Sequence, residues 1–295
     1  LLRIKTVRSP HRSNRTTRIL LAFILLHSLL SITSILPLEC LLKGSPVYTD
    51  DYSMHLYHSL TARKMLLSFG KTWGYDPFLL AGYPAGTLFA ADNMAWEMLF
   101  FAARFFFPDG FAFNSYIVLF FLAYPFLLYG AARNFDCSQA EALIAAGLSI
   151  LVFYLSFAID FISWGMISFV FLSYASIYFI SLFHVWLKNL KFSSYSVLLT
   201  ASALLMLLHI WAPFLIFVPC LVLYLLFFRS MKPVHHLMLV VVPAAVLLVN
   251  SFWLLPVGEF HYQITTERYL NMYDYMQNLD VLKPIRVYLL QNMFP

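Results

Sequence analysis

The feature that most constrains the fold of this chain is a series of long apolar stretches joined by short polar connections. A helix that crosses a bilayer needs roughly 20 mostly apolar residues. Of the 295 residues, 61% are hydrophobic and only 11% are charged, whereas a soluble domain carries about 45–50% apolar and about 25% charged residues. We therefore expect an all-α, polytopic helical membrane protein. The seven expected spans are 19–42, 111–132, 140–159, 166–187, 196–208, 211–228 and 237–255.

One apolar stretch is too short to be a span. Residues 94–107 number about fourteen and include Glu97 and Arg104, which favours an interfacial, juxtamembrane helix. The resulting organisation is a basic cytoplasmic tail (1–18), a membrane domain (19–255, with an outer loop at 43–110), and the start of an outer-side segment (256–295). We expect this last segment to continue beyond Pro295.

Basic residues indicate the orientation in the membrane. The first eighteen residues carry six Arg or Lys side chains and no Asp or Glu. Such a tail can bind nucleic acid, but ahead of an apolar helix it favours a cytoplasmic N-terminus, so we expect no nucleic-acid partner. The connections near Arg133, Lys188 and Arg229 then also lie in the cytoplasm, in agreement with the positive-inside rule. For a prokaryotic source the location is the plasma (inner) membrane.

The start of the outer loop contains the most suggestive polar pattern. Thr49 is the expected N-cap of a helix that opens with Asp50 and Asp51. Asp51, His55 and His58 follow at i, i+4 and i+7, so they share one helical face. A carboxylate and two imidazoles on one face suit general acid–base catalysis or the binding of a divalent cation. The alternative is a capped interfacial helix whose histidines are merely solvated.

Aromatic residues follow in the same loop, among Gly and Pro residues that impose turns. Trp73 and Tyr83 provide flat faces that suit either the membrane surface or a sugar. Two later outer loops add polar residues. Asp160 lies between two spans. Because an unpartnered acid is costly there, Asp160 is a functional candidate. His209 interrupts an apolar run just before Pro213, and a solvated histidine at a helix end is the alternative there.

The outer loop resembles that of a known superfamily. The run Asp50-Asp51-Tyr52-Ser53-Met54-His55 is followed by Ala62-Arg63-Lys64, Gly70, Trp73, Asp76-Pro77 and Gly82-Tyr83-Pro84. Together these are similar to the first outer loop of the GT-C superfamily, polytopic glycosyltransferases that use polyprenyl-phosphate sugars. The nearest resemblance is to the membrane proteins named after a 6-pyruvoyl-tetrahydropterin-synthase-related domain, which implies no pterin chemistry. It covers roughly residues 19–255.

The resemblance implies a membrane glycosyltransferase that takes a sugar from a polyprenyl-phosphate donor on the outer face. Asp50 or Asp51 would be the base, and Asp160 would correspond to a second acidic motif. The resemblance also allows a divalent cation as cofactor. Two other classes stay open: a transporter or flippase of lipid-linked material, and a non-catalytic scaffold. Besides the acids and His55, the residues expected to contact substrate are His58, Arg63, Lys64, Trp73, Tyr83 and His209.

Overall fold

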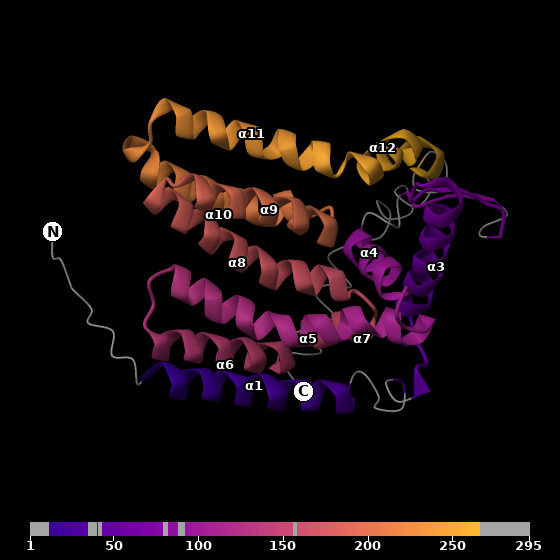
Figure 1. The fold of residues 1–295 in the computed structure, drawn as a ribbon, viewed down its shortest axis with the longest axis horizontal. Helices are drawn as coiled ribbons and strands as arrows, with labels where there is room; N and C mark the ends of the chain where they lie inside the picture. Colours follow the sequence, from indigo (N-terminus) through magenta and orange to yellow (C-terminus); the bar gives the residue numbers. More distant parts are fainter. Residues whose placement is uncertain are drawn as a thin grey trace, which may run out of the picture.

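A computed structural model of the chain describes residues 12–34, 40, 43–78, 82–87, 92–155 and 158–265. These residues are predominantly helical, which confirms the expected all-α architecture. Neighbouring helices of one bundle lie side by side (Figure 1): α5 packs on α6 and α8, α8 on α9 and α10, α9 on α11, and α1 on α5 and α6. The bundle helices are α1 (Arg12–Ser34), α5 (Asp109–Asn134), α6 (Gln139–Leu155), α8 (Ile167–Asn189), α9 (Phe192–Leu208), α10 (Ala212–Phe227) and α11 (Pro233–Val249).

The remaining elements gather at one end of the bundle, apart from the short 3₁₀ turn η2 (Phe228–Ser230), which follows α10 at the other end (Figure 1). Strands β1 and β2 form an antiparallel ribbon in which Gly74 lies opposite Ala85 and Asp76 opposite Tyr83. The elements at this end are α3 (Asp51–Phe69), β1 (Gly74–Asp76), β2 (Tyr83–Ala85), α4 (Met94–Ala103), α7 (Ala158–Ser163) and α12 (Ser251–Thr265).

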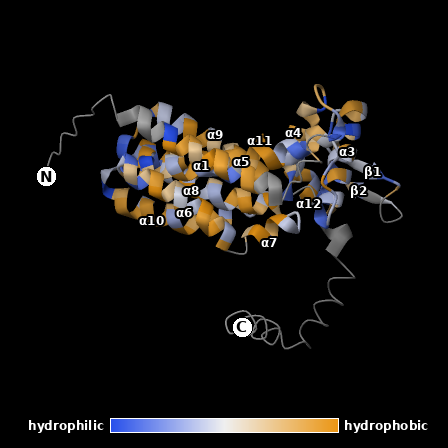
Figure 2. Ribbon diagram, turned by 90° about the horizontal axis from the view of Figure 1, so that it is seen from below, coloured by the Kyte–Doolittle hydropathy of each residue, from blue (hydrophilic) through white to orange (hydrophobic). Residues whose placement is uncertain are grey.

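The apolar helices indicate a membrane-embedded protein. In the described part of the chain, three are long and apolar enough to cross a bilayer: Asp109–Asn134, Ile167–Asn189 and Ala212–Ser230. A fourth span results if Pro233–Val249 and Ser251–Phe260 are counted as one segment bent by 74°. Helices α6 and α9 are apolar but shorter. Hydrophobic residues predominate along the bundle and hydrophilic residues collect near its ends (Figure 2), as expected where lipid surrounds the middle.

Two expected boundaries differ from the structure. Helix α1 begins at Arg12, so the basic tail is helical in its last part; no Gly or Pro interrupts this stretch. Helix α4 ends at Ala103 rather than 107, because Arg104 forms an ion pair with Asp109 and donates to the Phe107 carbonyl, which closes a turn. Most of the expected outer-side segment, 266–295, lies outside the described residues.

The last expected span, 237–255, is divided at Asn250. Helix α11 ends at Val249 and α12 begins at Ser251. The fully buried Asn250 side chain donates to the Val246 carbonyl (2.9 Å) and accepts a hydrogen bond from Trp253 Nε1 (2.9 Å). A buried amide with such partners stabilises the helix break, a conformation that hydropathy alone does not predict.

An aromatic core fixes α4 against the bundle. The ring of Trp96 stacks on those of Phe113 and Tyr116 in α5, with centroids 4.5 and 4.9 Å apart. Its Nε1 donates to the Phe113 carbonyl (3.0 Å), so the buried indole N–H is satisfied. Because α4 is held in this way, the residues just before it are placed at the end of the bundle.

Candidate functional site

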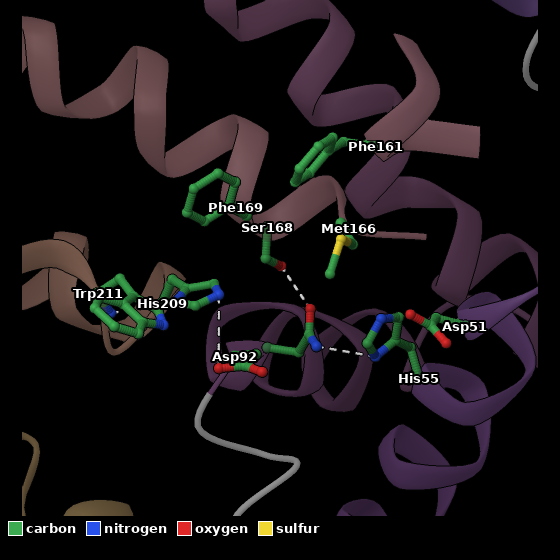
Figure 3. A pocket seen from close by; sticks show the side chains of 10 residues that line it. Asp51, His55, Asp92, Phe161, Met166, Ser168, Phe169, His209 and Trp211 are labelled. Carbon is green, nitrogen blue, oxygen red and sulfur yellow. Dashed lines mark hydrogen bonds and ion pairs between the residues drawn. The ribbon is translucent and has the colours of Figure 1, made fainter. Parts of the chain in front are cut away.

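A polar pocket of about 270 Å³ lies where the start of α3 meets three connections of the bundle (Figure 3). The first connection leads into α4, the second joins α7 to α8, and the third joins α9 to α10. Residues from four separate parts of the sequence therefore share one cavity. Its lining consists of Asp51, His55, Asp92, Asn93, Phe161, Met166, Ser168, Phe169, His209 and Trp211.

The start of α3 is docked tightly on the α7–α8 connection. The Asp51 backbone N–H donates to the Trp164 carbonyl (3.3 Å), and the Tyr52 hydroxyl donates to the Ile162 carbonyl (2.6 Å). Helix α3 begins at Asp51 rather than being capped by Thr49. The Thr49 carbonyl instead accepts the Tyr52 N–H (3.0 Å) in a turn that places Asp50 at φ 45°, a conformation unusual for a residue other than glycine.

A chain of hydrogen bonds crosses the floor of the pocket (Figure 3). Ser168 Oγ donates to Asn93 Oδ1 (2.7 Å), and Asn93 Nδ2 donates to His55 Nδ1 (2.9 Å). Because the Ser168 proton is used in this way, the Tyr116 hydroxyl must donate to Ser168 Oγ (3.2 Å). Asn93 is buried and thus links α3, α4 and α8 through one amide group.

These hydrogen bonds also determine which nitrogen of His55 carries the proton. Burial, with a smaller contribution from the neighbouring imidazole of His58, lowers the pKa of His55 to about 4. Nδ1 accepts from Asn93, and a hydrogen bond to the Gly165 backbone uses the ring as donor. Near neutral pH the ring is therefore neutral and carries its proton on Nε2. Since both ring nitrogens are engaged, His55 is better suited to hold the pocket together than to accept a proton.

Asp92 and His209 form a second polar contact on the opposite side of the pocket. Asp92 Oδ1 lies 3.5 Å from His209 Nε2, and the Trp211 backbone N–H donates to His209 Nδ1 (3.2 Å). The surrounding protein raises the pKa of Asp92 to about 6, although about half of its side chain is exposed, and burial lowers the pKa of His209 to about 4. Near pH 7 this pair therefore consists of a carboxylate and a neutral imidazole.

Asp51 is a further acidic group of the pocket, and its side chain is exposed. Its carboxylate forms no hydrogen bond or ion pair with the residues that the structure describes. A carboxylate that is open to solvent and lines a cavity is available to accept a proton or to bind a polar group.

Asp50 and Asp160 do not reach the pocket. Asp50 is exposed, and its carbonyl accepts a hydrogen bond from Ser53 Oγ (2.9 Å). Asp160 is exposed in the first turn of α7, whereas its neighbour Phe161 lines the cavity. The structure thus distinguishes two acids that the sequence left equivalent, and it places the expected second acid outside the cavity.

Of the expected substrate contacts whose side chains the structure describes, His209 alone lines the pocket. His58 is buried in α3 near Asp76, which accepts a hydrogen bond from Tyr57. Half-buried Arg63 and exposed Lys64 lie further along α3, where Lys64 Nζ is 5.8 Å from the Phe78 ring. Trp73 is covered by Lys71 Nζ (3.7 Å) and by the Phe260 ring (5.7 Å). The Tyr83 side chain lies outside the part of the chain described.

Sequence reasoning missed several groups. Asp92 and Asn93 directly precede the apolar run that starts at Met94, and this Asp-Asn pair is a common signal for a helix start. Ser168 and Trp211 carried no signal beyond their residue types.

Glu97 is fully buried, and neither carboxylate oxygen has a hydrogen-bond partner among the described residues. Burial raises the pKa of Glu97 well above its usual value.

Among the described residues no group of three or more His, Cys, Asp and Glu side chains is arranged to hold a metal ion. The comparisons with known proteins add no assignment: no family model matches the chain, and no curated protein or solved structure is significantly similar to it. The function is therefore argued from the geometry of the pocket.

Proposed function

We propose that the protein is a GT-C-type membrane glycosyltransferase that transfers a sugar from a polyprenyl-phosphate donor to an acceptor hydroxyl, with Asp51 as base. The observation that carries this proposal is the position of Asp51. It is an exposed carboxylate, free of partners among the described residues, and it lines the same cavity as Asp92 and His209. The outer-loop resemblance places a catalytic acid at this part of the chain.

The pocket offers a base and aromatic surfaces for such a reaction. The Asp51 carboxylate would take the proton from the acceptor hydroxyl as its oxygen attacks the anomeric carbon. The bond from that carbon to the phosphate oxygen breaks, and the phosphate leaves with the electron pair. The rings of Phe161, Phe169 and Trp211 line the cavity, and flat aromatic faces suit the apolar faces of a sugar.

The negative charge of the pocket restricts where the phosphate of the donor can lie. Within the ranges that the structure describes, no Lys or Arg lines the cavity, so a phosphate inside it would face carboxylates without a balancing cation from these residues. In this proposal the sugar occupies the cavity while the phosphate and the polyprenyl chain lie outside it. Arg63 and Lys64 on α3 remain the expected phosphate contacts, although the structure places neither at the cavity.

We also propose that α1, α5, α6, α8, α9, α10 and α11 each cross the membrane, with the N-terminus in the cytoplasm and the pocket on the outer face of a plasma membrane. Each of these helices overlaps one of the seven expected spans, and three of them, or four if the bent pair counts as one segment, are by themselves long and apolar enough to cross a bilayer. The end of the bundle opposite the pocket (Figure 1) carries basic residues in its connections, as the positive-inside rule requires. A cysteine introduced at Lys191 should be protected from an impermeant thiol reagent in intact cells, and one at Asp160 should be labelled; the reverse pattern would refute this topology.

The experiment that tests the activity compares Asp51→Asn with Asp50→Asn in the full chain in liposomes that contain radiolabelled polyprenyl-phosphate sugars. We expect Asp51→Asn to reduce turnover by about 10²-fold or more, as for loss of a general base, while Asp50→Asn retains it. Equal activity of the two variants would refute the role of Asp51. Donor translocation without transfer would favour the transporter, and a folded protein that shows neither would favour the scaffold.

A further inference from the structure

Among the described residues, the charges that face the cavity are of one sign. The residues lining it include two carboxylates, Asp51 and Asp92, and two histidines, His55 and His209. Both imidazoles are kept neutral near pH 7 by burial, and no Lys or Arg of the described part of the chain belongs to the lining. The cavity therefore presents net negative charge to whatever enters it, and this charge opposes the entry of an anion.

The apolar part of the lining consists mainly of rings that remain accessible. Trp211 is 52% exposed. Phe161 and Phe169 stack on each other with centroids 5.8 Å apart and both line the cavity. An indole face is the aromatic surface that attracts cations most strongly. Figure 3 shows Trp211 on the side of the cavity where Asp92 lies, while Asp51 lies on the opposite side.

We infer that this pocket binds a group that carries a protonated primary amine, recognised by the carboxylates of Asp51 and Asp92 and by the aromatic lining. Carboxylates satisfy the three donors of an ammonium group, and the ring faces add cation–π attraction. The inference deepens the proposed function and rests on it for one point, namely that the amine belongs to a sugar. An amine can also come from the ethanolamine headgroup of a membrane lipid, so the test includes both sources.

The binding test uses the full chain in nanodiscs at pH 7.5 and saturation-transfer NMR. The probes are the methyl glycosides of glucosamine, glucose and glucuronic acid, together with ethanolamine. We expect the glucosaminide to bind roughly fivefold more tightly than the glucoside, a factor in line with exposed cation–π and ion-pair contacts, and the glucuronide to bind most weakly. Ethanolamine binding as tight as that of the glucosaminide would assign the amine to a lipid headgroup.

Variants identify the groups responsible. Asp51→Asn/Asp92→Asn should abolish the preference for the glucosaminide over the glucoside, whereas Asp160→Asn, which removes a carboxylate outside the pocket, should retain it. Trp211→Leu retains both carboxylates and should reduce the preference in part, so the inference can be tested even if the double variant does not fold. Equal affinities for the glucosaminide and the glucoside, or a preference that survives the double variant, would overturn the inference.

The outcomes also separate this inference from the proposed function. Transfer of an uncharged sugar that depends on Asp51, without any preference for the amine, would support the transferase and overturn the amine site. A preference for the amine that depends on the two carboxylates, without transfer from any donor, would support the amine site and count against the transferase.

Discussion

Gly165 lies directly against Asp51, and this contact requires a glycine. A Cβ atom at position 165 would come within 2.9 Å of both the Asp51 Cβ and the Tyr52 backbone nitrogen, and the residue has φ +94°. We expect Gly165→Ala to displace the start of α3, to cost about 1–3 kcal/mol through backbone strain, and to reduce turnover at least tenfold. Thermal unfolding and the liposome assay measure the two effects.

A matched control for this substitution is Gly258→Ala. Nothing lies within 4 Å of a Cβ added at Gly258 in α12, so alanine should be tolerated there and should even favour the helix. If Gly165→Ala retained wild-type turnover and stability, the close packing of Asp51 on the α7–α8 connection would be wrong.

Asn93 should be needed for the arrangement of the pocket. Asn93→Ala removes the amide that joins Ser168 to His55. The buried Ser168 and the partly buried His55 then each lose one hydrogen-bond partner. A buried group without its partner costs about 1–3 kcal/mol, and we expect both a lower unfolding temperature and weaker turnover. Asn134→Ala serves as control because Asn134 donates to Ser181 Oγ (2.9 Å) at the other end of the bundle. It should lower stability alone, and an equal loss of turnover in the two variants would contradict a specific role for Asn93.

The raised pKa of Asp92 predicts that the stability of the protein depends on pH. Its pKa in the folded protein, about 6, is higher than the 3.8 that is usual for an aspartate. Folding therefore favours the protonated form, and this contribution is present below about pH 4 and is lost as the pH rises through 6. The Asp92→Asn variant does not lose stability in this way, because asparagine does not ionise. Relative to wild type, the variant should therefore gain stability between pH 4.5 and pH 7.5. The low pKa of His209 acts in the opposite direction but is common to both proteins.

Thermal unfolding midpoints of wild type and Asp92→Asn at several pH values test this prediction. Asp160→Asn removes a carboxylate outside the pocket and shows the effect of net charge alone. A difference between wild type and Asp92→Asn that does not change with pH would show that Asp92 has no raised pKa in the folded protein.

The bend between α11 and α12 should depend on Asn250. Asn250→Ala removes the bonds to Val246 and Trp253 and should cost about 1–3 kcal/mol. Trp253→Phe removes the indole donor while keeping an aromatic ring. Because the two side chains share one hydrogen bond, the double variant should lose less stability than the sum of the single variants, and simple additivity would contradict a shared contact.

Much of the fold follows from the sequence because the bilayer imposes a strong local rule. The expected span 166–187 corresponds to α8 (Ile167–Asn189), and 111–132 corresponds to α5 (Asp109–Asn134). A segment of this hydropathy has little choice except a helix, since its backbone polar groups must be satisfied internally. The bend at Asn250 was not predicted because it depends on contacts of one buried amide.

The chemistry of the pocket was only partly predictable. The spacing of Asp51 and His55 placed both on one face of α3, and both line the cavity. His58, which the same spacing places on that face, is buried away from it. Periodicity gives the face of a helix but not which part of that face a neighbouring segment covers.

The sequence by itself determined a helical, membrane-embedded chain and an acidic, histidine-containing start to its first long loop, because hydropathy and spacing act over a few turns of helix. Only the tertiary structure decided that Asp51 rather than Asp50 lines the pocket, and that Asp92, Asn93, Ser168 and Trp211 join it. Their meeting depends on long-range contacts, such as the close approach of Gly165 to Asp51 and the stacking of Trp96 on α5, which no local pattern encodes.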